Sequence, residues 1–149
     1  AYPDARIIWI HRDPAKLVTS LVSLNCALQL QFTRHLDAKR VGEYWAEKIS
    51  TAIEKATSFD QAAASEWCCH VQYEDLLAQP KATLDRVYEH FGDELNTLHK
   101  RRIDAWLTQR PQHAAGVHSY DPGDFGWTQK MLSERHSGYR QRYKVAQES

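Results

Sequence analysis

RIIWIHRDPAKLVTS occupies residues 6–20 and contains a predicted strand followed directly by a predicted helix. The strand, residues 6–11, is an almost unbroken apolar run rich in β-branched side chains, which is typical of a parallel strand buried on both faces. Asp13 suits the N-cap of a helix, and Pro14 suits its first position. We predict that this helix ends near residue 30 and carries an apolar stripe of Leu17, Val18, Leu21, Val22, Leu24 and Leu28.

The remaining sequence predicts one further strand and several helices. The strand is expected at residues 67–73, and the helices at residues 37–57, 80–91, 94–109 and 128–143. Two strands cannot by themselves form a sheet that is covered on both faces. The fold class is therefore predicted as α/β, and residues 1–149 are expected to form the C-terminal part of one larger domain.

Composition narrows the function classes. Of 149 residues, 42% are hydrophobic and 26% are charged, close to the average of globular proteins, which excludes disordered and collagenous chains. Lys and Arg total 19 and Asp and Glu total 19, so the chain lacks the basic footprint of a general nucleic-acid binder. The three cysteines predict no disulfide framework, and the sequence contains no apolar run of about 20 residues that could span a membrane. We expect a cytoplasmic protein with no nucleic-acid partner.

Arg12 and Ser20 form the candidate binding site. Arg12 follows the predicted strand, and ligands of open α/β sheets bind at the carboxyl ends of strands. The helix N-terminus favours an anion, and a guanidinium group can bind two phosphate oxygens at once. Ser20 shares a polar stripe of the helix with Lys16 and Ser23. It lies about 10 Å along the helix axis from the N-cap, within reach of a group that Arg12 binds. We predict that Arg12 and Ser20 bind one phosphate. The alternative is that Arg12 pairs with Asp13 or with a carboxylate near the C-terminus, while Ser20 only contacts a neighbouring element.

Residues 1–20 resemble the 3′-phosphate-binding segment of sulfotransferases that use 3′-phosphoadenosine-5′-phosphosulfate (PAPS). In that family an arginine at the strand end and a serine eight residues later contact the nucleotide's 3′-phosphate, which implies this role for Arg12 and Ser20. VQYEDLLAQP, residues 71–80, is similar to the family's V-x-Y-E-D-L-x-x-x-P motif, whose tyrosine contacts adenine. The matching position here is Tyr73.

Two further segments resemble the same family. RVYEHFG, residues 86–92, is similar to the helix that follows the adenine-binding motif, and HSYDPGDFG, residues 118–126, is similar to a C-terminal loop. The loop makes His118 and Tyr120 additional candidates for nucleotide binding. Ser119 departs from the lysine or arginine that is usual in this loop.

The resemblance implies a P-loop-type parallel sheet and transfer of a sulfuryl group from PAPS to a hydroxyl or amine of a small molecule, glycan or peptide. Phe32, Tyr44 and Trp45 are candidates for the lining of the acceptor site. No catalytic residue is assigned, because the family's phosphosulfate loop and acceptor-activating base belong to segments that precede the matched part. We therefore expect the isolated chain to be inactive in sulfuryl transfer. The resemblance implies no metal ion.

The residues also bear on three other interpretations. A fragment of a P-loop nucleotide or small-molecule kinase has a similar sheet, and a non-catalytic helical interaction module agrees with the helix-rich pattern. A metal site is not predicted at Cys68, Cys69 and His70, because neighbouring residues of a strand point to opposite faces. The sequence predicts no particular oligomeric state.

Overall fold

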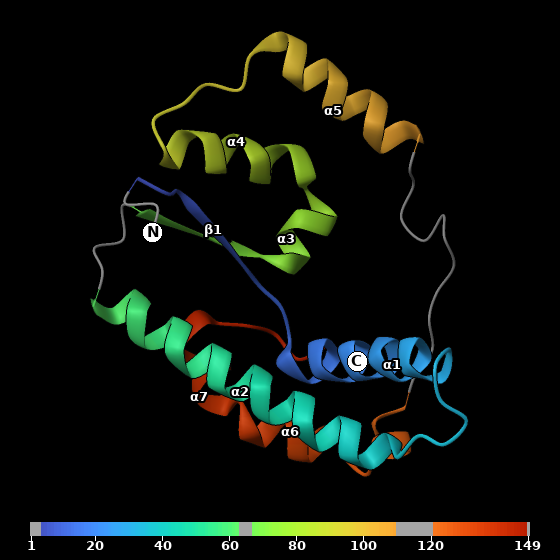
Figure 1. Ribbon diagram of the computed structural model, residues 1–149. Coiled ribbons are helices and arrows are strands. Elements are labelled where there is room, and N and C mark those ends of the chain that lie inside the picture. The colour runs from blue at the N-terminus through green and yellow to red at the C-terminus, as the bar shows by residue number, and fades with distance from the viewer. Residues whose placement is uncertain (1–3, 63–66, 110–120, 149) are drawn as a thin grey trace. The chain divides into compact units, whose positions relative to one another are not determined.

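A computed structural model (Figure 1) describes residues 4–62, 67–109 and 121–148 of the chain. The described residues divide into two compact units, each with its own core. The first unit combines residues up to His11 with the segment 67–109, and the second combines residues 12–62 with 121–148.

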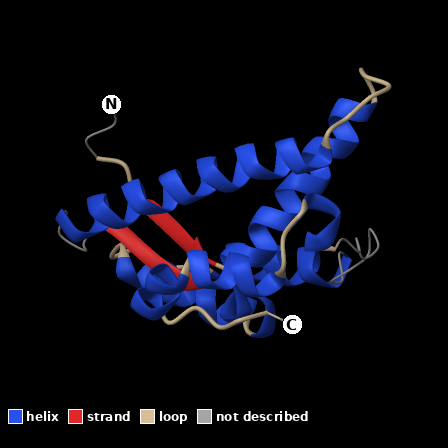
Figure 2. Cartoon of the chain, turned by 90° about the horizontal axis from the view of Figure 1, so that it is seen from below, coloured by secondary structure: helices blue, strands red, loops and turns tan. Residues whose placement is uncertain are grey.

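The first unit contains the sheet. Strand β1, Ile7–His11, and strand β2, Cys68–Gln72, pair in parallel, with Ile7 opposite Cys68 and His11 opposite Gln72. The two strands lie side by side in Figure 2, as the sequence predicts. The chain continues through three helices, α3 (Tyr73–Ala78), α4 (Pro80–His90) and α5 (Thr97–Gln109).

Local signals define the helices of this unit well. Pro80 is the first residue of α4, where its missing N–H costs no hydrogen bond. Gly92 follows the end of α4 with φ +71°, a left-handed conformation that glycine adopts without steric cost. Helix α3 was not predicted, because its residues continue directly from β2 and its single short segment carries no helical periodicity.

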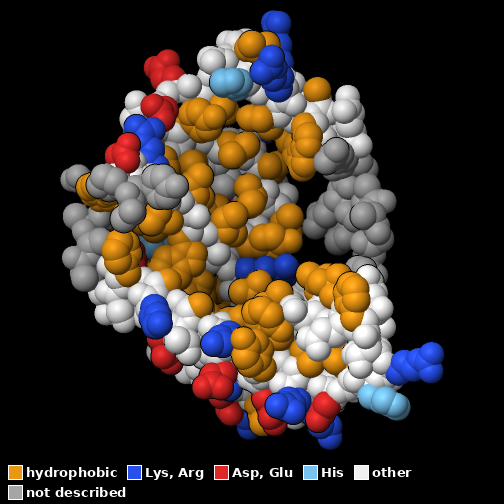
Figure 3. Space-filling view, viewed as in Figure 1, with side chains coloured by type: hydrophobic (Ala, Val, Ile, Leu, Met, Phe, Trp, Pro, Cys, Tyr) orange, Lys and Arg blue, Asp and Glu red, His pale blue; other side chains and the backbone are white. Residues whose placement is uncertain are grey.

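The core of the first unit lies on β2 and not on β1. Cys69, Val71 and Val87 are buried together, and Leu76 and Phe91 pack against them. The side chains of β1 are far more open, with Ile7, Ile8 and Ile10 exposed by 42%, 51% and 46%. In the view of Figure 3, many hydrophobic side chains are exposed at the surface. Among the described residues β1 is therefore not covered on both faces, because α3 and α4 pack against β2, and its burial on both faces stays a prediction for the larger domain.

The second unit is helical. It contains α1 (Pro14–Leu30), α2 (Ala38–Ala62), the 3-10 helix η2 (Pro122–Phe125), α6 (Gln129–Arg135) and α7 (Ser137–Tyr143). Its core joins α1, α2, η2 and α6 through Ala15, Val18, Val22, Cys26, Ala46, Phe125 and Leu132. Gly42 of α2 permits close approach to η2, since a Cβ there would stand 3.1 Å from the Phe125 Cβ.

Two helical predictions need correction. Val18 and Val22 of α1 are buried as expected, but Leu17, Leu24 and Leu28 of the same predicted stripe are exposed by 43%, 55% and 48%. The predicted final helix, residues 128–143, is interrupted at His136, whose backbone (φ −112°, ψ 19°) separates α6 from α7. None of the helices in the described ranges has both the length and the apolar character of a membrane-crossing helix.

Candidate functional site

The N-terminus of α1 is built around Asp13. This residue is 1% exposed, and its Oδ1 accepts a hydrogen bond of 3.0 Å from the backbone N–H of Ala15. The carboxylate thus satisfies one of the unpaired N–H groups of the first turn and complements the positive end of the helix. The predicted N-cap is confirmed.

Arg12 binds a carboxylate in a two-pronged arrangement. Its Nε donates to Glu148 Oε1 and its Nη2 donates to Glu148 Oε2, each at 2.9 Å. The side chains are 31% and 21% exposed, so the pair is partly shielded from water. The carboxylate alternative raised from the sequence is therefore seen for Arg12. The arrangement also shows that this guanidinium presents two parallel donors to an oxyanion.

Glu148 reaches Arg12 because the segment after α7 folds back toward α1. Lys144 has φ 54°, a left-handed conformation, and the next residue, Val145, is 7% exposed and hydrogen-bonded through its N–H to the Arg140 carbonyl at 2.9 Å. The backbone N–H of Glu148 then donates to Asp13 Oδ2 at 3.0 Å. Both oxygens of Asp13 thus accept hydrogen bonds, one from α1 and one from this segment.

Ser20 lies on α1, on a side that avoids the core. Ser20, Lys16 and Ser23 are all half-buried, whereas Thr19 and Val22 are buried. No described residue forms a hydrogen bond with the Ser20 hydroxyl. Joint binding of a phosphate by Ser20 and Arg12 stays a prediction.

Tyr73 belongs to the first unit, where it is half-buried and opens α3. It follows Gln72, the last residue of β2, and Arg12 follows His11, the last residue of β1. These two final residues are register partners in the sheet. The other two candidates, His118 and Tyr120, lie outside the described residues.

A histidine pair in the sheet was not predicted. His11 is 1% exposed, and its Nε2 lies 2.8 Å from Nδ1 of His70, with the rings nearly parallel at 14°. The pair follows from the strand register, which places Trp9 opposite His70 and brings His11 within reach, and the sequence of neither strand specifies that register. Cys69 is buried with Val71, whereas Cys68 is half-buried and His70 is exposed. Cys68 and His70, however, are two residues apart on one face, and their ligand atoms lie within 4.8 Å.

A cavity of about 660 Å³ in the second unit contains two of the three predicted acceptor-site residues. Tyr44 and Trp45 of α2 line it, with their rings edge to face at 85°. Polar side chains from α1, α2 and the connecting loop complete it: Asn25, Gln29, Thr33, His35, Asp37 and Arg40. Phe32 is 90% exposed and is not among the lining residues.

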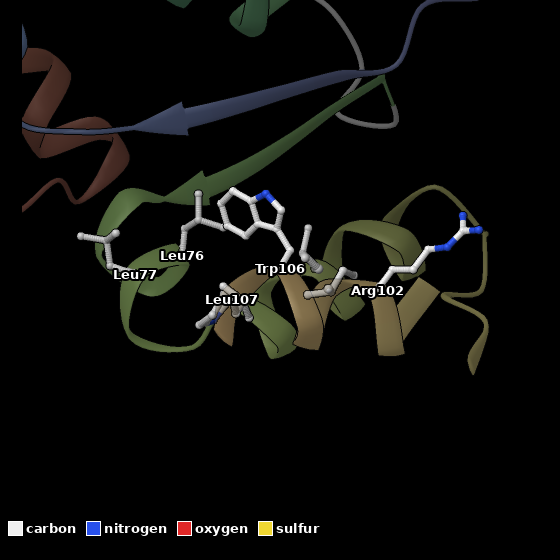
Figure 4. A pocket seen from close by; sticks show the side chains of 8 residues that line it. Leu76, Leu77, Arg102, Trp106 and Leu107 are labelled. Carbon is white, nitrogen blue, oxygen red and sulfur yellow. The ribbon is translucent and has the colours of Figure 1, made fainter. Parts of the chain in front are cut away.

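An apolar cavity of about 570 Å³ lies in the first unit between α5 and the segment of α3 and α4 (Figure 4). Trp106 and Leu76 contribute to its wall, and Arg102 is its one charged lining residue, with a side chain that extends away from the apolar group in this view. Salt bridges from Lys100 to Asp85 and from Lys81 to Asp104 connect α5 to α4 beside it. Sequence reasoning did not predict this cavity.

The chain is similar in sequence and in structure to known sulfotransferases. Residues 1–97 match the profile of the sulfotransferase family. The sulfotransferase STF9 from Mycobacterium avium is 26% identical with a TM-score of 0.88, over 99% of this chain and 38% of that protein. The sulfotransferase STF1 from Mycobacterium tuberculosis H37Rv is 26% identical with a TM-score of 0.70, over 92% of this chain and 34% of that protein. The chain therefore spans little more than a third of the length of these structures. No curated protein matches it significantly.

Proposed function

We propose, since this chain belongs to the sulfotransferase family, that it binds the nucleotide end of PAPS and serves transfer of the sulfuryl group to a hydroxyl or amine acceptor. The supporting observation is the position and geometry of Arg12. Its guanidinium directly follows a parallel strand, precedes the N-terminus of α1, and directs two donors at an oxyanion. A phosphate offers the same kind of paired oxygens as the carboxylate of Glu148.

Arg12 and Ser20 are proposed to recognise the 3′-phosphate, with Tyr73 contacting the adenine. In the reaction, the acceptor oxygen or nitrogen bonds to sulfur while the bond from sulfur to the 5′-phosphate oxygen breaks, and adenosine 3′,5′-bisphosphate leaves. The acceptor proton passes to a base that we do not assign within this chain. Arg12 and Ser20 thus contribute by positioning the donor and balancing charge, as in phosphoryl transfer. His118 and Tyr120 are proposed as further contacts to the nucleotide.

The rest of the reaction is proposed to use residues beyond the matched part of the family. The two solved relatives are more than twice as long as this chain. The chain then supplies the part that binds the 3′-phosphate and adenine. The cavity lined by Tyr44 and Trp45 is the proposed acceptor site, because it combines aromatic faces with several hydrogen-bonding side chains.

Calorimetric titration with adenosine 3′,5′-bisphosphate and with adenosine 5′-monophosphate tests the proposal. We expect the bisphosphate to bind more tightly, because only it carries the 3′-phosphate. Hydrogen bonds to charged groups contribute about 1.5–3 kcal/mol, so Arg12→Ala should weaken bisphosphate binding roughly 10- to 150-fold. Arg101→Ala, which removes an exposed arginine of α5, is the control and should change nothing.

Three outcomes contradict the proposal. Tighter binding of ATP than of the bisphosphate favours a kinase fragment. An unchanged dissociation constant in Arg12→Ala removes Arg12 from the site. A thermal midpoint that does not rise with added bisphosphate favours an interaction module, since a ligand that binds only the folded state must raise it.

A further inference from the structure

We propose that the Glu148 carboxylate competes with the 3′-phosphate of the nucleotide for Arg12, and thereby sets the affinity and selectivity of the binding site. This inference rests on the proposed function. It assigns to Glu148 the role of an internal ligand that an incoming nucleotide must displace.

The first argument is that the two anions need the same donors. Glu148 uses Nε and Nη2 of Arg12, each at 2.9 Å from a different carboxylate oxygen. These two N–H groups form the edge of the guanidinium that also grips two phosphate oxygens. One edge cannot direct linear hydrogen bonds to two oxyanions at once. We take the phosphate to bind at this same edge, where it would also lie next to a like charge, so Glu148 leaves when the phosphate binds.

The second argument is that Glu148 is delivered to Arg12 by a built segment. Val145 is anchored in the unit by its buried side chain and by its hydrogen bond to the Arg140 carbonyl. Glu148 itself is held through its backbone N–H by Asp13, the residue next to Arg12. The carboxylate therefore competes as a tethered group at a high effective concentration.

The third argument is that the segment can release Arg12 without unfolding its surroundings. Ala146 and Gln147, which join the Val145 anchor to Glu148, are both exposed. Breaking the contacts of Glu148 with Arg12 and Asp13 leaves the Val145 anchor intact. Displacement is then a local exchange of one anion for another at the same guanidinium.

Such competition lowers the affinity of ligands that carry a 3′-phosphate and leaves unchanged the affinity of ligands that lack one. The apparent dissociation constant of a site that is open in only a fraction of molecules rises by the inverse of that fraction. A phosphate dianion can replace the carboxylate on Arg12, whereas a nucleotide without a 3′-phosphate has no group for that position. Glu148 thus penalises binding modes that use Arg12 and leaves other contacts unaffected.

The test is calorimetric titration of the wild-type chain and of Glu148→Gln with adenosine 3′,5′-bisphosphate. If Glu148 closes the site in about nine of ten molecules, Glu148→Gln should bind the bisphosphate roughly tenfold more tightly. Its affinity for adenosine 5′-monophosphate should not change. Glu134→Gln removes the same charge from an exposed position of α6 and should behave as wild type.

The exchange rate of the Glu148 amide hydrogen gives a second readout. Bisphosphate at saturation should increase it, because the hydrogen bond to Asp13 is broken, and retained protection would overturn the inference. So would equal or weaker bisphosphate binding by Glu148→Gln in a protein where Arg12→Ala still weakens binding, and that result would leave the proposed function standing. Absence of bisphosphate binding in every variant would overturn both. Circular dichroism checks that each variant is folded.

Discussion

Ser50 Oγ lies 3.1 Å from Nε2 of His136, a histidine that is only 4% exposed. The other ring nitrogen, Nδ1, lies 3.0 Å from the Leu132 carbonyl and must donate to it. Nε2 of the neutral ring therefore accepts from the Ser50 hydroxyl, whose oxygen accepts in turn from Arg135 Nε at 2.8 Å. The two residues connect α2 with the junction of α6 and α7 through a histidine whose pKa is lowered by burial.

Because of His136, the free energy of unfolding should decrease as the pH falls. Burial lowers the pKa of His136, and the nearby Arg135 lowers it further, against the opposite effects of the Leu132 carbonyl, Asp13 and Glu54. Below the unfolded pKa of about 6.5, the unfolded chain binds a proton that the folded chain does not, so the free energy of unfolding decreases as pH falls.

The slope from one such group is at most about 1.4 kcal/mol per pH unit between its folded pKa and about 6.5. Urea unfolding at several pH values between 5 and 7.5 measures it. His136→Gln should have a shallower slope than wild type over this window. Parallel slopes in the two proteins would show that His136 does not contribute.

Two glycines in helices should respond oppositely to alanine. At Gly42 a Cβ would stand 3.1 Å from the buried Phe125 side chain and 3.3 Å from its carbonyl oxygen, so Gly42→Ala should lower the free energy of unfolding by about 1 kcal/mol. At Gly138 of α7 nothing lies within 4 Å, so Gly138→Ala should raise it by roughly 0.5–1 kcal/mol. Chemical denaturation measures both, and stabilisation by Gly42→Ala would show that α2 and η2 pack less closely.

Replacing neighbouring apolar residues of α1 by alanine should lower the free energy of unfolding by different amounts. Val22 is fully buried and Leu24 is 55% exposed. Val22→Ala should destabilise the chain by about 1–3 kcal/mol, because it leaves a cavity in the core, whereas Leu24→Ala should change stability by less than about 0.5 kcal/mol. Equal losses in thermal unfolding would contradict the burial pattern of this helix.

Ser20 should matter for binding and not for stability. Its hydroxyl forms no hydrogen bond with a described residue, so Ser20→Ala should leave the free energy of unfolding unchanged. If the hydroxyl donates to the 3′-phosphate, the same change should weaken binding of adenosine 3′,5′-bisphosphate by about tenfold. Ser23→Ala, one turn further along α1, is the matched control. Identical affinities of the two variants would count against Ser20.

The sequence predicts best those features that depend on neighbours in the chain. Asp13 and Pro14 mark the start of α1, Pro80 marks that of α4, and Gly92 marks its end, because each acts through its own backbone conformation. Strand β1 was likewise found from its unbroken, β-branched apolar run. The sulfotransferase family was identified correctly because several short motifs occur in the right order.

What depends on distant residues was harder to predict. The exposure of Ile8 and Leu24 follows from which elements pack against β1 and α1, and an apolar pattern is the same whether or not a partner covers it. The pairing of His11 with His70 depends on the register of strands far apart in sequence. For Arg12 the sequence left a phosphate and a carboxylate open as partners, but it could not identify Glu148, 136 positions away, as the carboxylate.

The two carboxylate oxygens of Asp13 accept hydrogen bonds from residues at very different distances along the chain. One donor is the N–H of Ala15, two residues later, and the other is the N–H of Glu148, 135 residues later. During synthesis on a ribosome, the first bond can form as soon as α1 emerges, whereas the second must wait until the segment that contains Glu148, 135 residues later, has been made. Closing so long a loop is entropically unfavourable and slow compared with forming a helix. The nascent protein therefore forms α1 early and completes the surroundings of Arg12 only after the segment that contains Glu148 has emerged.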